Sequence, residues 1–449
     1  MTENTELRLE SGARIAVIGA GPAGAFFTYF ALQEAARQGL RLDIVLYDGK
    51  PFGHSGPAGC NMCAGVVAAS LVEKLRAMGL TLPAEVVQRE IGGYRLQTNQ
   101  GSATLLPPAE SGTIYTIYRG NGPRGSTHAG NISFDDYLLE QVSSLGAKIV
   151  SERIKEIRLP REPGQKATII RQRGDEDTVD LVVGAFGVQG PLPQHVSSLG
   201  FGYRPPPTMP AYQVELHWGE AVVSRCLGNV VCLCALGLPG IEFIAMTPKR
   251  EYVTATLVGP EAGPKALVDF LAHPVVAHCL PAEWKPAANH CHCRPSVPVG
   301  PCRNAFTDRM VIVGDASVSR PYKNGLESAY MTAKAAAETA IRYGVSRQAW
   351  ERHYQPVCTQ IGQDSRYGQV LFWLNGLTFR AAPLAQLLLR AVRREQQIYP
   401  PSQRPINELL WSTFTGDRLY GEILRGILSP RSLLQLLRLG MRMDKREAE

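Results

Sequence analysis

The hydrophobic pattern begins with an apolar run at residues 15–18, which predicts a buried strand. The sequence GAGPAG follows at once at residues 19–24, and apolar side chains then recur at helical spacing as far as residue 36. A second apolar run at residues 42–47 ends in Asp48. Strand, glycine-rich turn, helix and strand in this order indicate the opening of a parallel α/β sheet.

The same alternation returns in two later parts of the chain. Apolar runs that lead into glycine turns stand at residues 180–190 and 309–314, and each predicts a further buried strand. The periodicity predicts helices at residues 68–78, 134–145 and 326–341, and a short strand at residues 147–150. Strand-like runs separated by turns fill residues 87–123 and 211–259, so we expect an antiparallel sheet there.

These patterns predict three regions. A Rossmann-type α/β domain takes residues 12–85, 128–200 and 300–348, in three pieces. An inserted α+β domain built on an antiparallel sheet takes residues 86–127 and 201–299, and a C-terminal helical region takes residues 349–449. At 449 residues the chain is long enough for two or three domains.

Composition and charge bear on the compartment and the partners that we expect for the protein. The first twelve residues are polar and acidic, so we expect a cytoplasmic protein in which the ten cysteines are not structural disulfides. The net charge is +7, and from residue 366 onward thirteen Lys and Arg stand against seven Asp and Glu. This basic tail lacks the interleaved aromatic residues of a nucleic-acid surface, so no nucleic-acid partner is expected. Peripheral contact with the inner face of a membrane is expected instead.

Two apolar stretches in the tail bear on that expectation. Residues 369–389 are rich in Leu and Phe but are interrupted by Arg380 and Pro383, so they do not predict a membrane-spanning helix. Residues 432–443 place polar and apolar side chains on opposite helical faces. Either both stretches contact a membrane surface, or they pack on the body of the protein and line a tunnel for a lipid.

The first glycine-rich turn has the spacing of a dinucleotide-binding site. Gly19 permits the tight turn, Gly21 allows close approach of a pyrophosphate, and Gly24 lets the helix pack on the sheet. The phosphates would then lie at the helix N-terminus, where free N–H groups favour negative charge. Asp48 is placed to accept a hydrogen bond from a ribose hydroxyl.

Three motifs together carry a resemblance to a known family. GAGPAG at 19–24 with Asp48, VVGAFGVQG at 182–190 and VGDASVSRPYKNGLESA at 313–329 occur in the order and spacing of certain flavoproteins. The sequence thus resembles the p-hydroxybenzoate hydroxylase group of glutathione-reductase-type flavoproteins, and within it the geranylgeranyl reductase family. The features similar to that family are Cys63-Ala-Gly-Val66 and the basic, apolar C-terminal region.

The resemblance implies FAD as cofactor, and it assigns further residues to the FAD site. These are Gly187 from the second motif and, from the third, Gly314, Asp315, Asn324, Gly325 and Leu326. Asp315 would hydrogen-bond the ribityl chain, or else it is simply a helix N-cap. Phe186 stands where the group has Asp, which favours a ferredoxin-like protein electron donor over NADPH.

The cysteines near the second strand allow three interpretations. Cys60 and Cys63 form a C-x-x-C motif, in which Cys63 could act as proton donor to substrate or redox partner of the flavin. Alternatively both join Cys291 and Cys293 as four thiolates around a metal ion or iron–sulfur cluster. In the third interpretation all four are small buried hydrophobic residues.

The function predicted from these features is that of an FAD-dependent oxidoreductase. It would reduce carbon–carbon double bonds of an isoprenoid or other apolar, lipid-like substrate at a membrane surface. The alternatives are a flavin monooxygenase for an aromatic or polyketide-like compound, and an electron-transfer flavoprotein with a cysteine-bound metal centre. Fold alone does not separate these activities.

Overall fold

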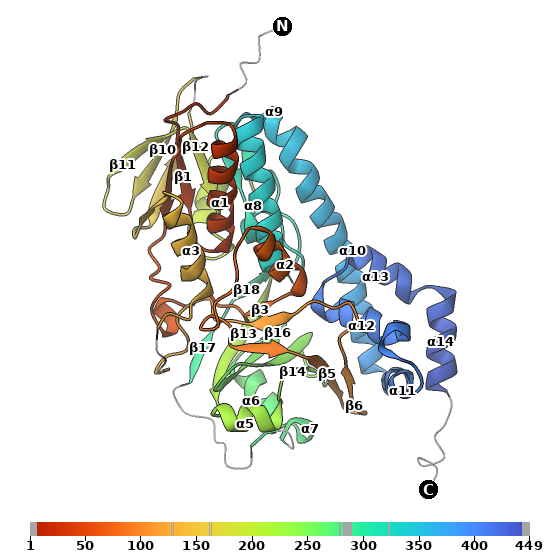
Figure 1. Ribbon diagram of the computed structural model, residues 1–449. Coiled ribbons are helices and arrows are strands. Elements are labelled where there is room, and N and C mark those ends of the chain that lie inside the picture. The colour runs from red at the N-terminus through yellow and green to blue at the C-terminus, as the bar shows by residue number, and fades with distance from the viewer. Residues whose placement is uncertain are drawn as a thin grey trace.

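The computed structural model describes residues 7–441, except 127, 129, 161, 163, 278–279, 282–289 and 322–323. Three regions are visible in Figure 1: an α/β domain at the top, a second sheet below it, and helices of the C-terminal region at the side. The long helix α10 (Gln355–Arg380) runs from the α/β domain down to these last helices. The predicted fold class is therefore confirmed: a Rossmann-type α/β domain, an inserted sheet domain and a C-terminal helical region.

The α/β domain is built on a six-stranded sheet with the order β19–β20–β12–β1–β2–β8. Its strands are β1 (Arg14–Ile18), β2 (Asp43–Tyr47), β8 (Lys148–Val150), β12 (Leu181–Gly184), β19 (Phe306–Thr307) and β20 (Met310–Ile312). All neighbours run parallel except β19 and β20. The apolar runs of the sequence form the central strands because those are buried on both faces.

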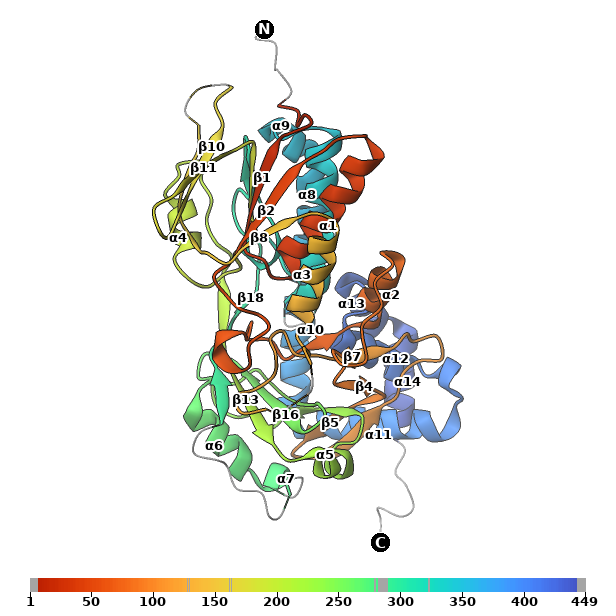
Figure 2. The same ribbon diagram turned by 60° about the vertical axis from the view of Figure 1, so that its left-hand side comes forward.

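Helices and a small sheet cover the two faces of this sheet (Figure 2). One face carries α1 (Pro22–Arg37), α3 (Phe134–Ser144) and α8 (Gly325–Arg342), and α1 packs along α8. The other face carries the antiparallel strands β9 (Ile154–Arg158), β10 (Ala167–Arg171) and β11 (Glu176–Val179), with α4 (Leu192–Ser197) beside them. Small side chains such as Ala333 and Ala337 on α8 allow this close packing of helix on helix.

The second sheet has the order β17–β13–β16–β15–β14–β5–β6, with β18 paired to β13. Its strands are β5 (Gly93–Thr98), β6 (Gly101–Leu105), β13 (Thr208–His217), β14 (Val230–Ala235), β15 (Phe243–Pro248), β16 (Tyr252–Val258), β17 (Cys291–Cys293) and β18 (Ser296–Pro298). Adjacent strands are antiparallel apart from β14 and β5, which run parallel. The predicted antiparallel sheet is thus observed apart from that one pairing, where β5 enters the sheet from a distant part of the chain.

Alternation along the strands separates the two faces of this second sheet. Apolar residues such as Val214 and Leu257 lie in the core under α5 (Glu220–Cys226), α6 (Pro264–Ala272) and α7 (Pro274–Ala277). The opposite face carries Gln213 and Thr256 and looks toward the α/β domain. A three-stranded sheet of β3 (Val66–Val67), β7 (Ile114–Thr116) and β4 (Arg89–Ile91), with α2 (Ala69–Ala77), links the two domains.

The C-terminal region is helical throughout its described part. It comprises α9 (Arg347–Ala349), the π-helix η3 (Trp350–Tyr354), α10, α11 (Ala382–Ile398), α12 (Pro405–Thr415), α13 (Tyr420–Ile427) and α14 (Pro430–Gly440). Helices α11, α12 and α14 share a core with β5 and β6. The predicted helix at 432–443 corresponds to α14, and residues 442 and 443 lie outside the described residues. Among the helices of the described chain, none has the length and apolar character needed to cross a bilayer.

Candidate functional site

The first glycine motif forms the turn between β1 and α1. Gly19 has φ +103°, and a Cβ there would overlap the carbonyl of Ala185 on the neighbouring strand segment. A Cβ at Gly24 would overlap the carbonyl of Gly19, so helix α1 can approach the turn only with glycine at this position. Gly21 has an ordinary φ of −68° and serves as N-cap of α1 without a side-chain cap. Because Gly21 has no side chain, it leaves room beside the N-terminus of α1. The free N–H groups there favour an anion.

Asp48 lies at the end of β2, beside the same turn. Its Oδ2 accepts a hydrogen bond of 2.9 Å from the Ala20 N–H, and its Oδ1 accepts one of 2.9 Å from the Lys50 N–H. Burial raises the pKa of Asp48, and these two N–H groups partly offset the rise. Asp48 thus holds the glycine turn and also lines the cavity next to it. Its contact with a ribose remains a prediction.

A buried ion pair that the sequence did not reveal stands next to Gly21. The Arg119 guanidinium donates two hydrogen bonds of 2.9 Å to the Asp135 carboxylate, whose side chain is fully buried. Asn61 donates a third hydrogen bond to the same carboxylate. A Cβ at Gly21 would lie 3.3 Å from both an Arg119 and an Asn61 nitrogen. These donors therefore border the space where the motif predicts a pyrophosphate.

The third motif closes the opposite side of the site. Gly314 has φ +67° and faces Ala23 on α1, where a Cβ would lie 2.7 Å away. Burial raises the pKa of Asp315, while Arg119 and a hydrogen bond with Ser319 lower it. Asn324, in the left-handed conformation at φ 58°, is the N-cap residue of α8. The alternative in which Asp315 caps this helix is therefore wrong.

A cavity of about 620 Å³ joins these elements between the two domains. The predicted site residues that line it are Gly19, Gly21, Asp48, Cys63, Gly187, Asp315, Asn324, Gly325 and Leu326. Gly24 and Gly314 stand behind this lining and set the packing of α1. The second sheet adds Gln213, Thr247 and Thr256. The three motifs, far apart in the sequence, thus meet around one space.

The structure separates the roles of the four cysteines. Cys63 lines the cavity, and its Sγ accepts a hydrogen bond of 3.4 Å from the Gly65 N–H. Cys60 is partly buried beside it, and its Sγ accepts one of 3.2 Å from the Met62 N–H. Cys291 and Cys293 lie on β17, where the Cys293 thiol donates to Gln213 at 3.5 Å.

A metal centre finds no support in this arrangement. In the described part of the chain, no group of three or more His, Cys, Asp or Glu side chains is arranged to hold a metal ion. The predicted set of four thiolates at Cys60, Cys63, Cys291 and Cys293 is thus not assembled as a ligand shell. Two other cysteines, Cys232 and Cys234, lie buried in the core of the second sheet.

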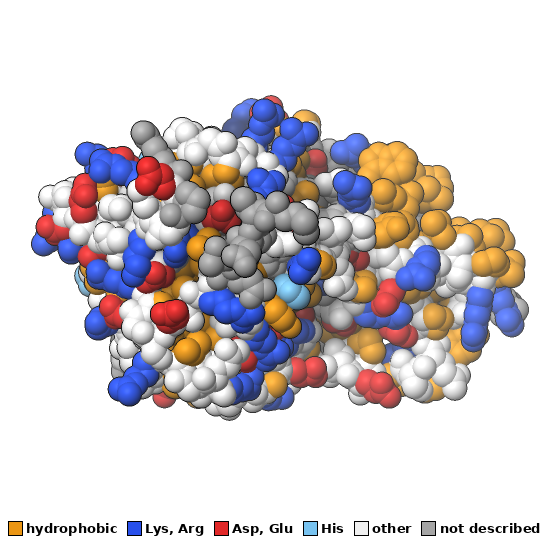
Figure 3. Space-filling view, turned by 90° about the horizontal axis from the view of Figure 1, so that it is seen from above, with side chains coloured by type: hydrophobic (Ala, Val, Ile, Leu, Met, Phe, Trp, Pro, Cys, Tyr) orange, Lys and Arg blue, Asp and Glu red, His pale blue; other side chains and the backbone are white. Residues whose placement is uncertain are grey.

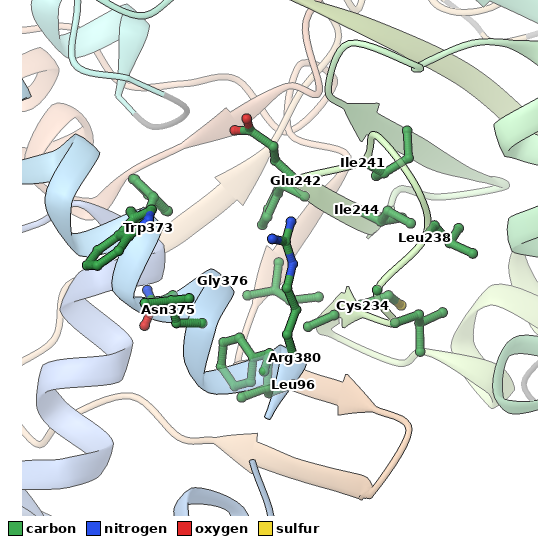
Figure 4. A pocket seen from close by; sticks show the side chains of 18 of the residues that line it. Leu96, Cys234, Leu238, Ile241, Glu242, Ile244, Trp373, Asn375, Gly376 and Arg380 are labelled. Carbon is green, nitrogen blue, oxygen red and sulfur yellow. The ribbon is translucent and has the colours of Figure 1, made fainter. Parts of the chain in front are cut away.

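A second cavity of about 430 Å³ lies between α10 and the second sheet (Figure 4). Its wall is mostly apolar, with Leu96, Leu238, Ile241 and Ile244 on the sheet side. Helix α10 supplies Phe372, Trp373, Leu377, Phe379 and, at its end, Arg380. The Arg380 side chain extends from the end of the helix in the direction of Glu242, whose carboxylate points away from it.

The two cavities adjoin. Phe243 from β15 and Phe414 from α12 line both of them, so these two residues lie where the cavities meet. The apolar stretch at residues 369–389 therefore lines a cavity with one face. The helix is also exposed in part: Trp373, which lines the cavity, is 63% exposed, and Tyr367, Val370 and Leu377 are exposed along the same helix. Figure 3 shows hydrophobic side chains gathered over these C-terminal helices.

Solved structures share this fold across almost the whole chain. A flavoprotein/dehydrogenase from Cytophaga hutchinsonii is 13% identical with a TM-score of 0.64, covering 96% of this chain and 100% of its own. The flavin-dependent brominase Bmp2 is 13% identical with a TM-score of 0.58, covering 93% of each chain. The oxygenase for 2-methyl-3-hydroxypyridine-5-carboxylic acid is 16% identical with a TM-score of 0.55. The match covers 88% of this chain and 98% of the oxygenase chain.

No family model matches the sequence, and no curated protein is similar to it. The structural likeness therefore defines a class of fold, that of the flavin-dependent oxidoreductases, halogenases and hydroxylases. The predicted flavoprotein fold is confirmed. The finer resemblance to geranylgeranyl reductases is not matched among these structures and belongs to the proposal below.

Proposed function

We propose that the protein binds FAD between its two domains and reduces carbon–carbon double bonds of an apolar, lipid-like substrate. The observation that carries the proposal is the pair of adjoining cavities. One is framed by the three nucleotide-binding motifs, and the other is an apolar space beside α10. Geranylgeranyl reductases, which the sequence motifs resemble, act on substrates of this class.

The residues present fit the cofactor. Gly21 leaves open the approach to the N-terminus of α1, and Arg119 and Asn61 border that space while they donate to Asp135. Asp48 would face the adenosine ribose and Asp315 the ribityl chain, and both residues line the motif-framed cavity. When bound, FAD supplies hydride chemistry; the protein supplies binding and orientation.

Reduction of a double bond also needs a proton. Cys63 is the predicted donor because its thiol lines the cavity and is followed by the small residues Ala64 and Gly65. A thiol at this wall would protonate one carbon while the hydride adds to the other. Protonation by a positioned acid accelerates such a step by about 10²–10⁴-fold.

The second cavity favours an elongated apolar substrate with an anionic end. Its lining is Leu, Ile and Phe for the most part, and such pockets orient a ligand through a few polar groups. Arg380 is the cation at its edge and would pair with a phosphate or carboxylate. The exposed face of α10, including Trp373, lies beside this cavity and would contact an anionic membrane from which the substrate enters.

The proposal is tested by anaerobic turnover. Protein loaded with FAD is reduced with dithionite and mixed with geranylgeranyl diphosphate, a long chain with an anionic end. We expect the flavin absorbance to return and the product to gain two hydrogen atoms for each bond reduced. Dodecyl phosphate, which has no double bond, is the control and should leave the flavin reduced.

Two results would overturn the proposal. If the flavin is reoxidised only when O₂ is admitted and the product gains an oxygen atom, the monooxygenase alternative holds. If the purified protein binds no FAD at micromolar concentration, the cofactor assignment fails. A Cys63→Ser variant that turns over at the wild-type rate would reject the proton-donor role alone.

A further inference from the structure

The N-terminal end of α8 opens into the motif-lined cavity. Asn324, Gly325 and Leu326 line that cavity, and Asn324 is the N-cap residue of the helix. An Asn in this position ordinarily accepts a hydrogen bond, through its side-chain oxygen, from the second or third N–H group of its helix. The Asn324 side chain makes no such bond, so it leaves the N-terminus of α8 uncapped beside the cavity.

Asn324 is turned away from its own helix in both backbone and side chain. The backbone is left-handed, with φ 58° and ψ 33°, whereas a capping residue is typically extended. The side-chain Nδ2 donates hydrogen bonds of 2.6 Å to the Gly416 carbonyl and 3.0 Å to Glu327 Oε2. Asn tolerates the left-handed region better than most residues do, but at a cost in free energy. These two hydrogen bonds therefore hold Asn324 in a conformation that does not cap α8.

Arg320 holds the Gly416 carbonyl in place. Gly416 begins the turn of residues 416–419 between α12 and α13, which we call the C-terminal turn. The Arg320 guanidinium donates hydrogen bonds of 2.6 Å to the Gly416 carbonyl and 2.5 Å to the Arg418 carbonyl. It also forms an ion pair of 3.1 Å with Asp364 on α10. Because Arg320 is only 8% exposed, water competes little for these contacts.

Helix α13 fastens the C-terminal turn to the third motif as well. The Arg320 guanidinium lies over the Tyr420 ring, 4.5 Å from its centre, and the Tyr420 hydroxyl donates a hydrogen bond of 3.2 Å to the Pro321 carbonyl. The Gly421 N–H donates one of 3.1 Å to Asp364 Oδ1. The third motif and the C-terminal turn are thus joined through one buried network.

We propose that Arg320 and the C-terminal turn are positioning elements of the cofactor site, which draw the Asn324 side chain away from α8 and keep that wall of the cavity open to FAD. Arg320 acts through Asn324 and is not itself a catalytic residue. The role toward FAD rests on the proposed function, whereas the positioning of Asn324 does not.

The consequence of losing this network follows from the preferences of Asn. Without the Gly416 carbonyl, Asn324 gains free energy by returning to an extended backbone and capping α8 with its side-chain oxygen. That oxygen would then occupy the N–H groups that face the cavity. Bound FAD would have to displace it, so the affinity for FAD should fall although the helix itself gains a cap.

Two variants of Asn324 in the full chain isolate this effect. The carboxylate of Asn324→Asp cannot donate to Gly416 or Glu327, yet Asp is a strong N-cap. We expect a urea midpoint near that of the wild type and an FAD dissociation constant raised by about tenfold or more, the effect of one competing hydrogen bond. Asn324→Ser also caps well and is too short to reach Gly416, so this neutral variant should behave alike and exclude charge repulsion as the cause. A merely structural role for Asn324 would instead lower the urea midpoint of both variants.

Variants of Arg320 test the other end of the network. Arg320→Met should also weaken FAD binding, and Arg320→Lys should give an intermediate affinity, because it keeps the charge beside Asp364 but not the fork that binds two carbonyls. Arg418→Met is the control: it removes an exposed side chain that pairs with Glu408, keeps the carbonyl of the turn, and should match the wild type. FAD dissociation constants within about threefold of the wild type in both Asn324 variants would overturn the proposal, even if Arg320→Met does not fold.

Hydrogen exchange of the FAD-free proteins tests the positioning without the cofactor. In Arg320→Lys we expect faster exchange at residues 414–421, where the network is loosened, and unchanged exchange along α1. In Asn324→Asp we expect slower exchange at residues 326–327, whose N–H groups a cap engages. Exchange equal to the wild type in both variants would overturn the positioning. If the wild-type protein binds no FAD, the proposed function fails, and the exchange measurements alone decide whether the turn positions Asn324.

Discussion

The proposed FAD site predicts opposite consequences for two glycines that stand two residues apart. Gly19 and Gly21 both belong to the first motif, but only Gly19 is required by the backbone. Its φ is +103°, and a Cβ there would collide with the Ala185 carbonyl. Gly21 has φ −68°, and its Cβ would meet only side-chain atoms, nitrogens of Arg119 and Asn61 at 3.3 Å and Asp135 Oδ2 at 3.8 Å. The two positions therefore separate the needs of the fold from those of the ligand.

The expected magnitudes follow from these environments. Gly19→Ala costs about 1–2 kcal/mol for the left-handed backbone alone, before the collision with a carbonyl is added. Gly21→Ala changes the stability of the FAD-free protein by about 1 kcal/mol, since it alters an N-cap preference and requires the Arg119 and Asn61 side chains to shift slightly. Its methyl group would instead displace a phosphate from a backbone N–H. A hydrogen bond to a charged group contributes about 1.5–3 kcal/mol, so FAD binding should weaken by about 10- to 100-fold.

Urea titration of the FAD-free proteins measures their stability. Quenching of flavin fluorescence measures their affinity for FAD. We expect a lowered unfolding midpoint for Gly19→Ala, and a near wild-type midpoint with a raised FAD dissociation constant for Gly21→Ala. A folded Gly21→Ala protein whose FAD affinity lies within threefold of the wild type would refute the placement of the pyrophosphate.

Three further predictions concern other parts of the molecule. Asp135→Ala leaves Arg119 buried without its carboxylate, so the free energy of unfolding in urea should fall by about 3–5 kcal/mol; a loss below about 1 kcal/mol would contradict this. Hydrogen bonding to Arg342 lowers the pKa of Glu34 to about 2, below its usual value near 4.3. The stabilisation is thus present above about pH 4.3 and lost as the pH falls toward 2, so urea midpoints of wild type and Glu34→Gln should differ at pH 6 and converge at pH 2. Trp373→Ser should weaken co-sedimentation with anionic vesicles about tenfold if α10 docks there, and unchanged binding would exclude that face.

The motif glycines were predictable from the sequence because each is dictated by its immediate neighbours. A turn with positive φ or a close helix–strand contact admits only glycine, and the apolar run before it and the helical period after it identify the context. The same local logic gave the strands β1, β2 and β12 within a residue or two. The position of Asp48 was predictable for the same reason, because it comes at the end of the strand next to that turn.

The polar groups that complete the site were not predictable in this way. Arg119 and Asp135 meet across sixteen residues, and an Asp in the first turn of a helix is common for reasons unrelated to ligands. Lys249 meets Tyr118 and Glu215 only because three segments far apart in the sequence converge. Periodicity encodes which face of an element is buried, but it does not encode which polar groups become neighbours once the faces pack.

The C-terminal helices are part of the site rather than an addition to it. Phe414 on α12 lies where the two cavities meet, and Asn324 of the third motif donates a hydrogen bond of 2.6 Å to the Gly416 carbonyl. A buried ion pair of 3.1 Å between Arg320 and Asp364 ties the same motif to α10. Displacing α10 would therefore strain the wall that the flavin motifs share with it. If an apolar substrate enters beside α10, as proposed, it would meet Phe243 and Phe414 before the larger cavity, because these two residues line both cavities.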